Sequence, residues 1–205
     1  MKPADSGYAD VNGLHMYYEV YGTGKPIVLL HGSYMNIALN WSRIIPLLAK
    51  DRKVIAAEMQ GHGRTRDIPR EFSYEGMADD VSGLLEHLKI ESADILGYSM
   101  GGGVAFQVAV RHPEKVRRLV VLSGVYAHDG WWPIGDADGV RYEHAVELFR
   151  VKGGGKMGDI HGLPKSRLAI LPSTTHIGMM RRTDWLIPMI SDFLDSDLDT
   201  APPTF

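Results

Sequence analysis

The sequence of 205 residues has no cysteine, little net charge and no long hydrophobic run. The lack of cysteine excludes disulfides, thiolate metal sites and cysteine nucleophiles. A formal net charge of −3 offers no electrostatic attraction for nucleic acid or for an acidic membrane surface. No apolar run reaches the ~18 residues of a membrane-spanning helix, and residues 1–7 lack the apolar stretch of a signal peptide. We therefore expect a cytoplasmic location and neither a membrane nor a nucleic-acid partner.

The composition is that of an ordinary globular protein, with 44% hydrophobic and 23% charged residues. Short apolar runs alternate with amphipathic segments, so we expect one α/β domain over residues 1–205. After a hairpin turn at 11–14, the predicted strands are 27–30, 54–57, 93–96, 116–122 and 167–171. The predicted helices are 41–50, 74–88, 104–111, 143–150 and 185–194. Strands that alternate with helices favour a mainly parallel sheet with helices on both faces.

A serine between glycines, in Gly97-Tyr98-Ser99-Met100-Gly101, joins a predicted strand to a predicted helix of small residues. This setting is typical of a nucleophile elbow, a sharp turn that holds a serine with strained backbone angles. Glycine is needed on both sides because a Cβ two residues away would collide across the turn. The turn also directs backbone N–H groups of a helix N-terminus at the serine, where they favour negative charge.

A second turn, His31-Gly32-Ser33, directly follows the apolar run at 27–30. Its glycine is expected to let the loop lie close to the site. The Ser33 N–H then becomes a candidate donor to an oxyanion, together with the Met100 N–H. We interpret the His31 side chain as structural, bonded to the loop backbone.

Nine histidines are candidates for a general base. We favour His176 because it lies a few residues past the last predicted strand, at the sheet edge expected for Ser99; His128 is a weaker alternative. An acid is needed to hold the imidazole in one tautomer, and Asp136 and Asp138 lie between the serine and the histidine. We favour Asp138, because an aspartate at position 136 more often bonds its own loop backbone in such turns.

The same aspartates match part of a calcium-binding loop, but its full spacing and closing glutamate are missing. Zinc-binding and phosphate-binding motifs are also missing from the sequence. We therefore expect no metal and no cofactor.

Five segments of the sequence resemble the α/β-hydrolase family, in its esterase type. They are His31-Gly32, Gln60-Gly61-His62-Gly63, Gly97 to Gly102, Gly135 to Val140, and Thr175-His176. The order serine, aspartate, histidine is also the order of this family. The resemblance runs from Tyr8 to Leu194. It implies that Ser99 is the nucleophile, His176 the base and Asp138 the acid, with the Ser33 and Met100 N–H groups as the oxyanion hole.

The sequence departs from this family after the strand at 116–122. Members of the family usually insert a helical cap and a further strand there, whereas only residues 125–134 lie between Gly124 and Gly135. Ten residues are too few for a cap or for a parallel crossover. We consider three explanations: a reduced core with an open site and possible loss of one core strand, a deletion that damages the site, or a homodimer that completes the sheet.

The function that the resemblance implies is hydrolysis of small carboxylic esters through an acyl-enzyme. Aromatic residues around the site, Tyr34, Tyr98, Trp131 and Trp132, are expected to make the substrate pocket largely apolar. The two tryptophans have alternative roles in contacting a partner or in covering apolar surface. One alternative function is a ligand-binding protein with little or no turnover, and another is a C–C bond hydrolase or a perhydrolase. The serine at the elbow disfavours dehalogenases and epoxide hydrolases, which have an aspartate there.

Overall fold

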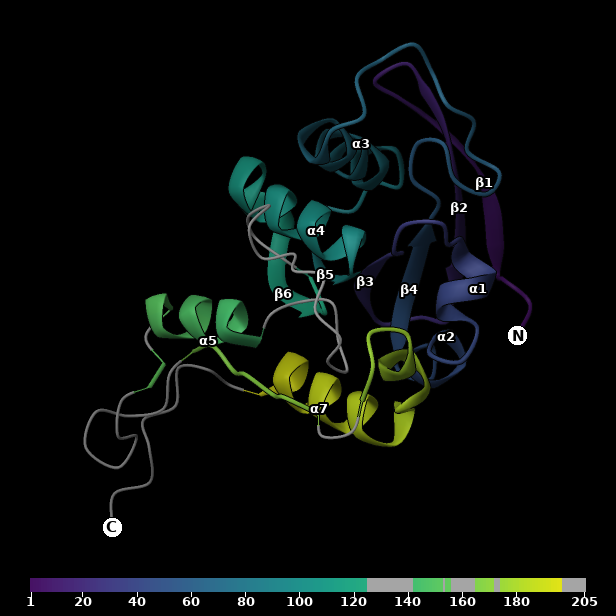
Figure 1. Ribbon diagram of the computed structural model, residues 1–205. Helices are drawn as coiled ribbons and strands as arrows, with labels where there is room; N and C mark the ends of the chain where they lie inside the picture. The colour runs from purple at the N-terminus through teal and green to yellow at the C-terminus, as the bar shows by residue number, and fades with distance from the viewer. Residues whose placement is uncertain (125–141, 153, 156–164, 172–173, 197–205) are drawn as a thin grey trace. The chain divides into compact units, whose positions relative to one another are not determined.

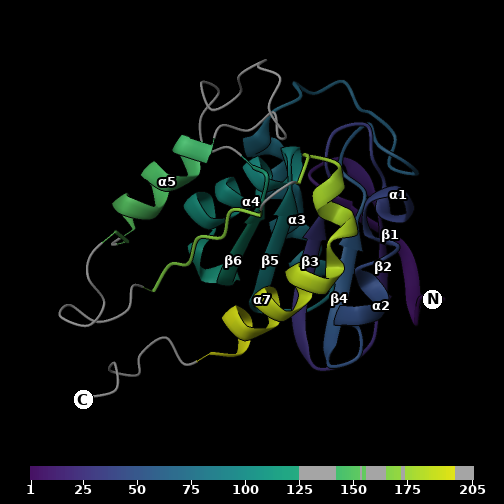
Figure 2. The same cartoon turned by 60° about the horizontal axis from the view of Figure 1, so that its bottom comes forward.

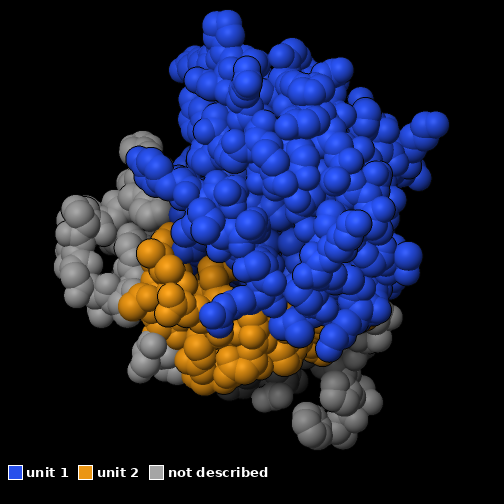
Figure 3. Space-filling view, turned by 90° about the vertical axis from the view of Figure 1, so that its right-hand side faces the viewer, with its two compact units in different colours: residues 1–127 blue, residues 128–205 orange. Residues whose placement is uncertain are grey.

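The computed structural model describes residues 1–124, 142–152, 154–155, 165–171 and 174–196. The chain divides into two compact units, Met1–Ala127 and His128–Phe205, which we describe separately (Figure 3). One domain over residues 1–205 therefore stays a prediction.

Unit 1 begins with the expected hairpin. Strand β1 (Asp5–Val11) pairs antiparallel with β2 (Leu14–Tyr21), and Val11 lies opposite Leu14. The two residues of the turn, Asn12 and Gly13, have φ angles of 49° and 80°. Two positive φ angles in a two-residue loop make a type I′ turn, whose twist matches that of the flanking strands. The hairpin prediction is confirmed.

Six strands form one sheet in the order β1-β2-β4-β3-β5-β6 (Figure 1). The remaining strands are β3 (Lys25–Leu30), β4 (Arg52–Ala57), β5 (Ala93–Tyr98) and β6 (Val116–Leu122). Strands β4, β3, β5 and β6 run parallel, while β2 pairs antiparallel with β4. The predictions of a mainly parallel sheet and of its four parallel strands are confirmed. The carboxyl ends of β3, β4 and β5 therefore meet at one edge, where the candidate site lies.

Two long helices cover one face of this sheet, α3 (Tyr74–His87) and α4 (Met100–Arg111), as Figures 1 and 2 show. Ser73 caps α3 by accepting a hydrogen bond from the Gly76 N–H. The two helices bury a shared core against alternate residues of the central strands. That core includes Val28, Leu30, Ile55, Ile95, Val81, Leu84, Val104 and Ala105.

The helix predicted at 41–50 is wrong. Two short helices, α1 (Ile37–Trp41) and α2 (Ile45–Leu48), occupy this part of the chain instead. Pro46 lies in the first turn of α2. Proline has no N–H to continue a preceding helix but is tolerated in the first turn of a new one, so the chain starts a new helix here. The apolar spacing alone does not reveal that break.

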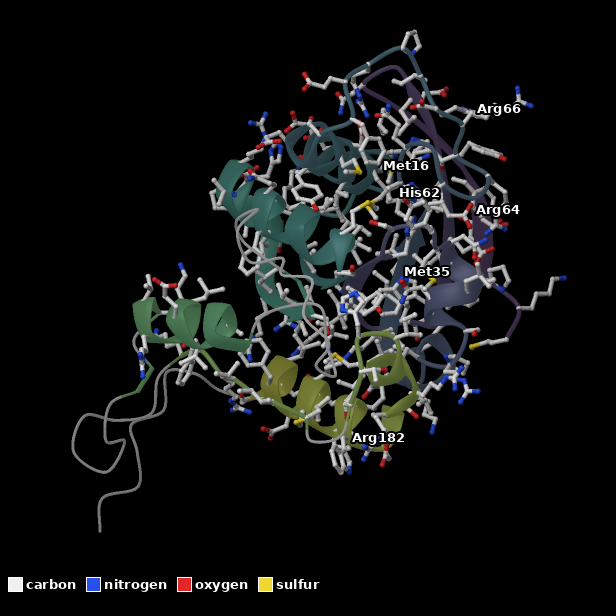
Figure 4. The ribbon with its side chains drawn as sticks, in the orientation of Figure 1. Met16, Met35, His62, Arg64, Arg66 and Arg182 are labelled. Atoms are coloured by element: carbon white, nitrogen blue, oxygen red, sulfur yellow. The ribbon has the colours of Figure 1, made fainter. Side chains whose placement is uncertain are left out.

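Unit 2 contains α5 (Tyr142–Val151), the 3-10 helix η3 (Gly178–Arg181) and α7 (Thr183–Asp195). The guanidinium of Arg182, labelled in Figure 4, stacks 3.4 Å from the ring centroid of Trp185 at the start of α7. The predicted helices at 143–150 and 185–194 are confirmed. In the described part of the chain, no helix is both long and apolar enough to cross a membrane.

The strand predicted at 167–171 is wrong. Residues 166–171 have no regular secondary structure, and Leu168 and Ile170 are 36% and 58% exposed. Side chains hold the segment instead, because Ser166 donates to the Lys152 carbonyl and Arg167 forms an ion pair with Asp192 of α7. A strand needs a neighbouring strand for its backbone hydrogen bonds, and an apolar run does not specify one.

Leu84 is buried and Leu39 is exposed, so their replacement by alanine should lower the stability of the protein by very different amounts. We expect Leu84→Ala to lower the free energy of unfolding by about 2–5 kcal/mol, because Leu84 is fully buried and its loss leaves a cavity. The matched control is Leu39→Ala, at a side chain 69% exposed, which should change it by less than about 0.5 kcal/mol. Urea unfolding measures both, and equal losses would contradict this core.

Candidate active site

Ser99 lies at the junction of β5 and α4 in a strained conformation. Its φ and ψ are 53° and −119°, which a residue with a side chain rarely adopts. The Ser99 N–H donates to the Leu122 carbonyl of β6 at 2.9 Å, and its carbonyl accepts from the Gly102 N–H at 2.8 Å. These bonds fix the turn from both sides and hold a residue that is only 7% exposed.

Two glycines make this turn sterically possible. A Cβ on Gly97 would lie 2.1 Å from the Gly101 carbonyl oxygen, and a Cβ on Gly101 would lie 2.1 Å from the Leu30 carbonyl oxygen. Both neighbours are backbone atoms, which cannot move aside as a flexible side chain can. The serine therefore depends on glycine at both positions, as the sequence pattern predicts.

The turn after β3 lies against the elbow. A Cβ on Gly32 would be 3.2 Å from the Ser99 Cβ and 2.9 Å from the Tyr98 ring. The Gly32 N–H donates to the Asn40 Oδ1 at 2.8 Å, and the Gly32 carbonyl accepts from the Met35 N–H at 3.2 Å. Within the residues that the structure describes, the amides of Ser33 and Met100 donate to no protein acceptor.

His31 is fully buried below this turn. Its Nδ1 bonds to the Gly32 carbonyl at 2.9 Å, so Nδ1 carries the proton, and its Nε2 accepts from the Met59 N–H at 3.1 Å. Burial lowers the pKa of His31 to about 4. Both ring nitrogens are occupied by the backbone, which agrees with the structural interpretation of this side chain.

Glu58 is a buried acid that sequence reasoning missed. It directly follows β4, is fully buried and accepts from the Arg64 Nε at 3.0 Å and the Arg64 Nη2 at 2.8 Å. It also accepts from the Ile37 N–H at 3.3 Å, which ties the start of α1 to this loop. Gly63 has φ of +57°, and a Cβ there would lie 2.3 Å from Glu58 Oε2. The sequence pattern that could have revealed Glu58 is an acid directly after a buried strand, followed by an arginine six residues later.

A hollow of about 390 Å³ opens beside these loops. It is lined by Tyr34, Met35, Asn36, Gly61, His62 and Gly63. Met35 and His62 are labelled in Figure 4 and come from the loops after β3 and β4, respectively. The hollow therefore belongs to the same edge of the sheet as Ser99.

The other predicted residues fall in different parts of the chain. Tyr98 is 2% exposed in β5 and Tyr34 is 96% exposed. His176 lies in a turn just before η3, in unit 2. Asp138 and its alternative Asp136, the tryptophans Trp131 and Trp132, the bridge 125–134 and His128 lie outside the described residues. Within unit 1, the structure thus brings Ser99 and its chain neighbour Met100 close to Gly32, the residue before Ser33. Among the described residues, no cluster of three or more His, Asp or Glu side chains is arranged to hold a metal ion.

A family model for the alpha/beta hydrolase fold matches residues 25–146, more than half of the chain. The protein belongs to the alpha/beta hydrolase family. The fold described above, with its serine at the end of β5, is the fold of that family.

Two curated members of the family share more than a third of the residues over the matched region. A 2-hydroxymuconate semialdehyde hydrolase of Pseudomonas sp. (strain CF600) is 42% identical over 105 residues, which cover 50% of this chain and 37% of that protein. An epoxide hydrolase of Corynebacterium sp. (strain C12) is 37% identical over 115 residues, which cover 56% and 40%, respectively. The chain thus spans well under half the length of these relatives.

Solved structures show the same relationship. The meta-cleavage product hydrolase CumD of Pseudomonas fluorescens IP01, in a mutant form complexed with acetates, has a TM-score of 0.57 and 32% identity, over 66% of this chain and 49% of that chain. A CIB-like hydrolase of Thermoplasma acidophilum has a TM-score of 0.75 over 93% of this chain and 97% of that chain. At 19% identity the second likeness concerns the fold alone.

The buried ion pair of Glu58 predicts a pH-dependent contribution to stability. Burial alone raises the pKa of the Glu58 carboxyl, but hydrogen bonds from Arg64 and its charge outweigh burial, so the pKa is lowered from 4.5. A lowered pKa in the folded state means that the pair stabilises the protein above pH 4.5 and that this contribution is lost as the pH falls further. The unfolding free energies of the parent and Glu58→Gln should therefore converge below pH 4.5. Urea unfolding at several pH values measures this, with Glu71→Gln, at an exposed glutamate, as the control. A difference that is constant with pH would contradict the assignment.

Proposed function

We propose that the protein is a serine hydrolase that cleaves small carboxylic esters. The observation that carries this proposal is the strained elbow of Ser99, which lies against Gly32 in the turn that also carries Ser33. A serine hydroxyl held at such a turn is directed towards a substrate, and amides of the neighbouring turns favour negative charge on the carbonyl oxygen under attack. Each such donor typically contributes about 10²–10³-fold to turnover.

In the proposed mechanism, His176 takes the proton of the Ser99 hydroxyl as the serine oxygen attacks the ester carbonyl. The carbonyl oxygen becomes an oxyanion that accepts hydrogen bonds from Ser33 and Met100. His176 then gives its proton to the leaving alcohol, and an acyl-enzyme results. Water then attacks the acyl carbonyl as His176 takes its proton, and His176 returns that proton to the Ser99 oxygen as the acid leaves. Asp138 orients the imidazole and stabilises its charged form.

The proposed substrate is a small molecule with an apolar acyl or aryl group, with Tyr34, Tyr98, Trp131 and Trp132 at its pocket. This mechanism uses no metal and no cofactor. A homodimer and a cytoplasmic location also stay predictions from the sequence.

Cleavage of a carbon–carbon bond is the second candidate. It is favoured by the 42% identity to a protein named 2-hydroxymuconate semialdehyde hydrolase. Epoxide hydrolysis is disfavoured despite the relative of that name, because Ser99 stands where such enzymes have an aspartate. Assays of p-nitrophenyl acetate and 2-hydroxymuconate semialdehyde side by side distinguish the two reactions. A third candidate, a binding protein of this fold, predicts stabilisation by ester ligands without turnover of either compound.

A fluorophosphonate probe tests the nucleophile without knowledge of the substrate. We expect a single adduct in the intact mass, mapped to Ser99, and hydrolysis of p-nitrophenyl acetate. Ser99→Ala should abolish the adduct and lower kcat by about 10⁶-fold, to background. The control is Ser42→Ala, at an exposed serine, which should retain both. An adduct elsewhere, or turnover that survives Ser99→Ala, would exclude this mechanism.

The two candidate acids are distinguished by their amide variants. Asp138→Asn should lower kcat by about 10⁴-fold, because the amide favours the wrong tautomer of the histidine. Asp136→Asn is the matched variant and should change kcat far less. Steady-state kinetics on p-nitrophenyl acetate measures both. The reverse order of effects would assign the acid to Asp136.

A further inference from the structure

Apart from Tyr34, the residues that line the hollow have no role in the mechanism above. The hollow has an apolar side from Met35 and polar groups from Tyr34, Asn36 and His62. The Asn36 Oδ1 is occupied, since it accepts from the Leu39 N–H at 2.9 Å. Among the other polar side chains that line the hollow, the imidazole of His62 is held in place by a hydrogen bond to the backbone.

The hydrogen bonds of His62 determine which ring nitrogen can accept. Its Nδ1 lies 2.8 Å from the Gln60 carbonyl oxygen. A carbonyl oxygen only accepts, so Nδ1 carries the proton and the Nε2 of the neutral ring is an acceptor. Within the described residues Nε2 has no hydrogen-bond partner, and the residue is half-buried at the hollow.

The ring is held in place by the loop that carries it. The His62 N–H donates to the Met59 carbonyl, and the His62 carbonyl accepts from the Thr65 N–H, both at 3.0 Å. Beneath it, the buried Gln60 side chain donates to Asp67 at 2.7 Å and accepts from the Arg70 Nε at 3.0 Å. An acceptor fixed in this way loses little entropy when a ligand binds.

The hollow is also connected to the elbow through one short turn. Gly32 approaches Ser99, and Tyr34 and Met35 of the same turn line the hollow. A substrate with its carbonyl at Ser99 would reach His62 by extending past Tyr34 and Met35, which follow Gly32 by two and three residues.

We propose that the hollow is a specificity subsite for a hydroxyl group on the substrate, which donates its hydrogen bond to His62 Nε2. This inference rests on the proposed ester hydrolysis and names the substrate class as hydroxylated esters. Met35 supplies the apolar contact. An ester without the hydroxyl leaves His62 Nε2 without a hydrogen bond, and this difference favours the hydroxylated ester.

Binding to the full-length Ser99→Ala protein tests the subsite without turnover. The probes are ethyl 3-hydroxybutyrate and ethyl butyrate, which differ by one hydroxyl. We expect the hydroxylated ester to bind about tenfold more tightly, with a shift of the His62 Nε2 resonance in ¹⁵N-histidine spectra. His62→Phe should reduce the affinity ratio to about one, whereas His62→Gln, which keeps an acceptor at the position of Nε2, should restore part of it. His15→Phe, at an exposed histidine of β2, is the matched control and should keep the ratio.

Three results would overturn the subsite: equal affinity for the two esters, a preference that survives His62→Phe, or tighter binding of monoethyl succinate, which would indicate an anion site. Failure of the proposed function looks different. In that case the protein with Ser99 forms no fluorophosphonate adduct and hydrolyses neither ester, while the Ser99→Ala protein still binds the hydroxylated ester through His62.

Discussion

Backbone lies directly against backbone where β3 ends, β5 ends and α4 begins. Gly101 is in contact with the Leu30 carbonyl, and Gly97 with the Gly101 carbonyl, at distances that leave no room for a Cβ. This contact is the constraint on which the candidate site depends, because it forces the strained angles of Ser99 and brings the Gly32 turn beside it. The parallel part of the sheet supplies the geometry, since its four strands all end at one edge.

A second constraint is polar and holds the loops that surround the elbow. Glu58 joins the loop after β4 to the start of α1, and His31 joins the turn after β3 to Met59. The hydrogen bonds of Glu58 come mainly from Arg64, and those of His31 involve the backbone. The loops are therefore fixed relative to each other within unit 1. A rim of this kind can present the hollow and the two amides in a constant arrangement, as preorganised binding requires.

The sequence predicts the parts of this architecture that depend on local chemistry. The apolar runs at 27–30 and 54–57 can be strands only if buried on both faces, and glycines around Ser99 have no better explanation than close approach. Prediction fails where tertiary context decides. Pro46 divides a helix that the apolar spacing favours, the run at 167–171 has no strand partner among the described residues, and the role of Glu58 depends on Arg64 folding back onto it. The candidate base His176 rests on a strand at 167–171 that the structure does not contain, and the candidate acid rests on chain order, which carries no distance.

The buried neutral imidazole of His31 has a consequence for acid tolerance. Burial lowers its pKa to about 4, so between that value and its ordinary 6.5 the unfolded chain takes up a proton that the folded chain does not. Acidification through this range therefore weakens the fold, and the strain falls on the Gly32 turn, whose carbonyl and neighbouring loop the ring ties together. A proton on Nε2 would also remove the acceptor of the Met59 N–H, so the bond between the two loops is lost when His31 becomes charged.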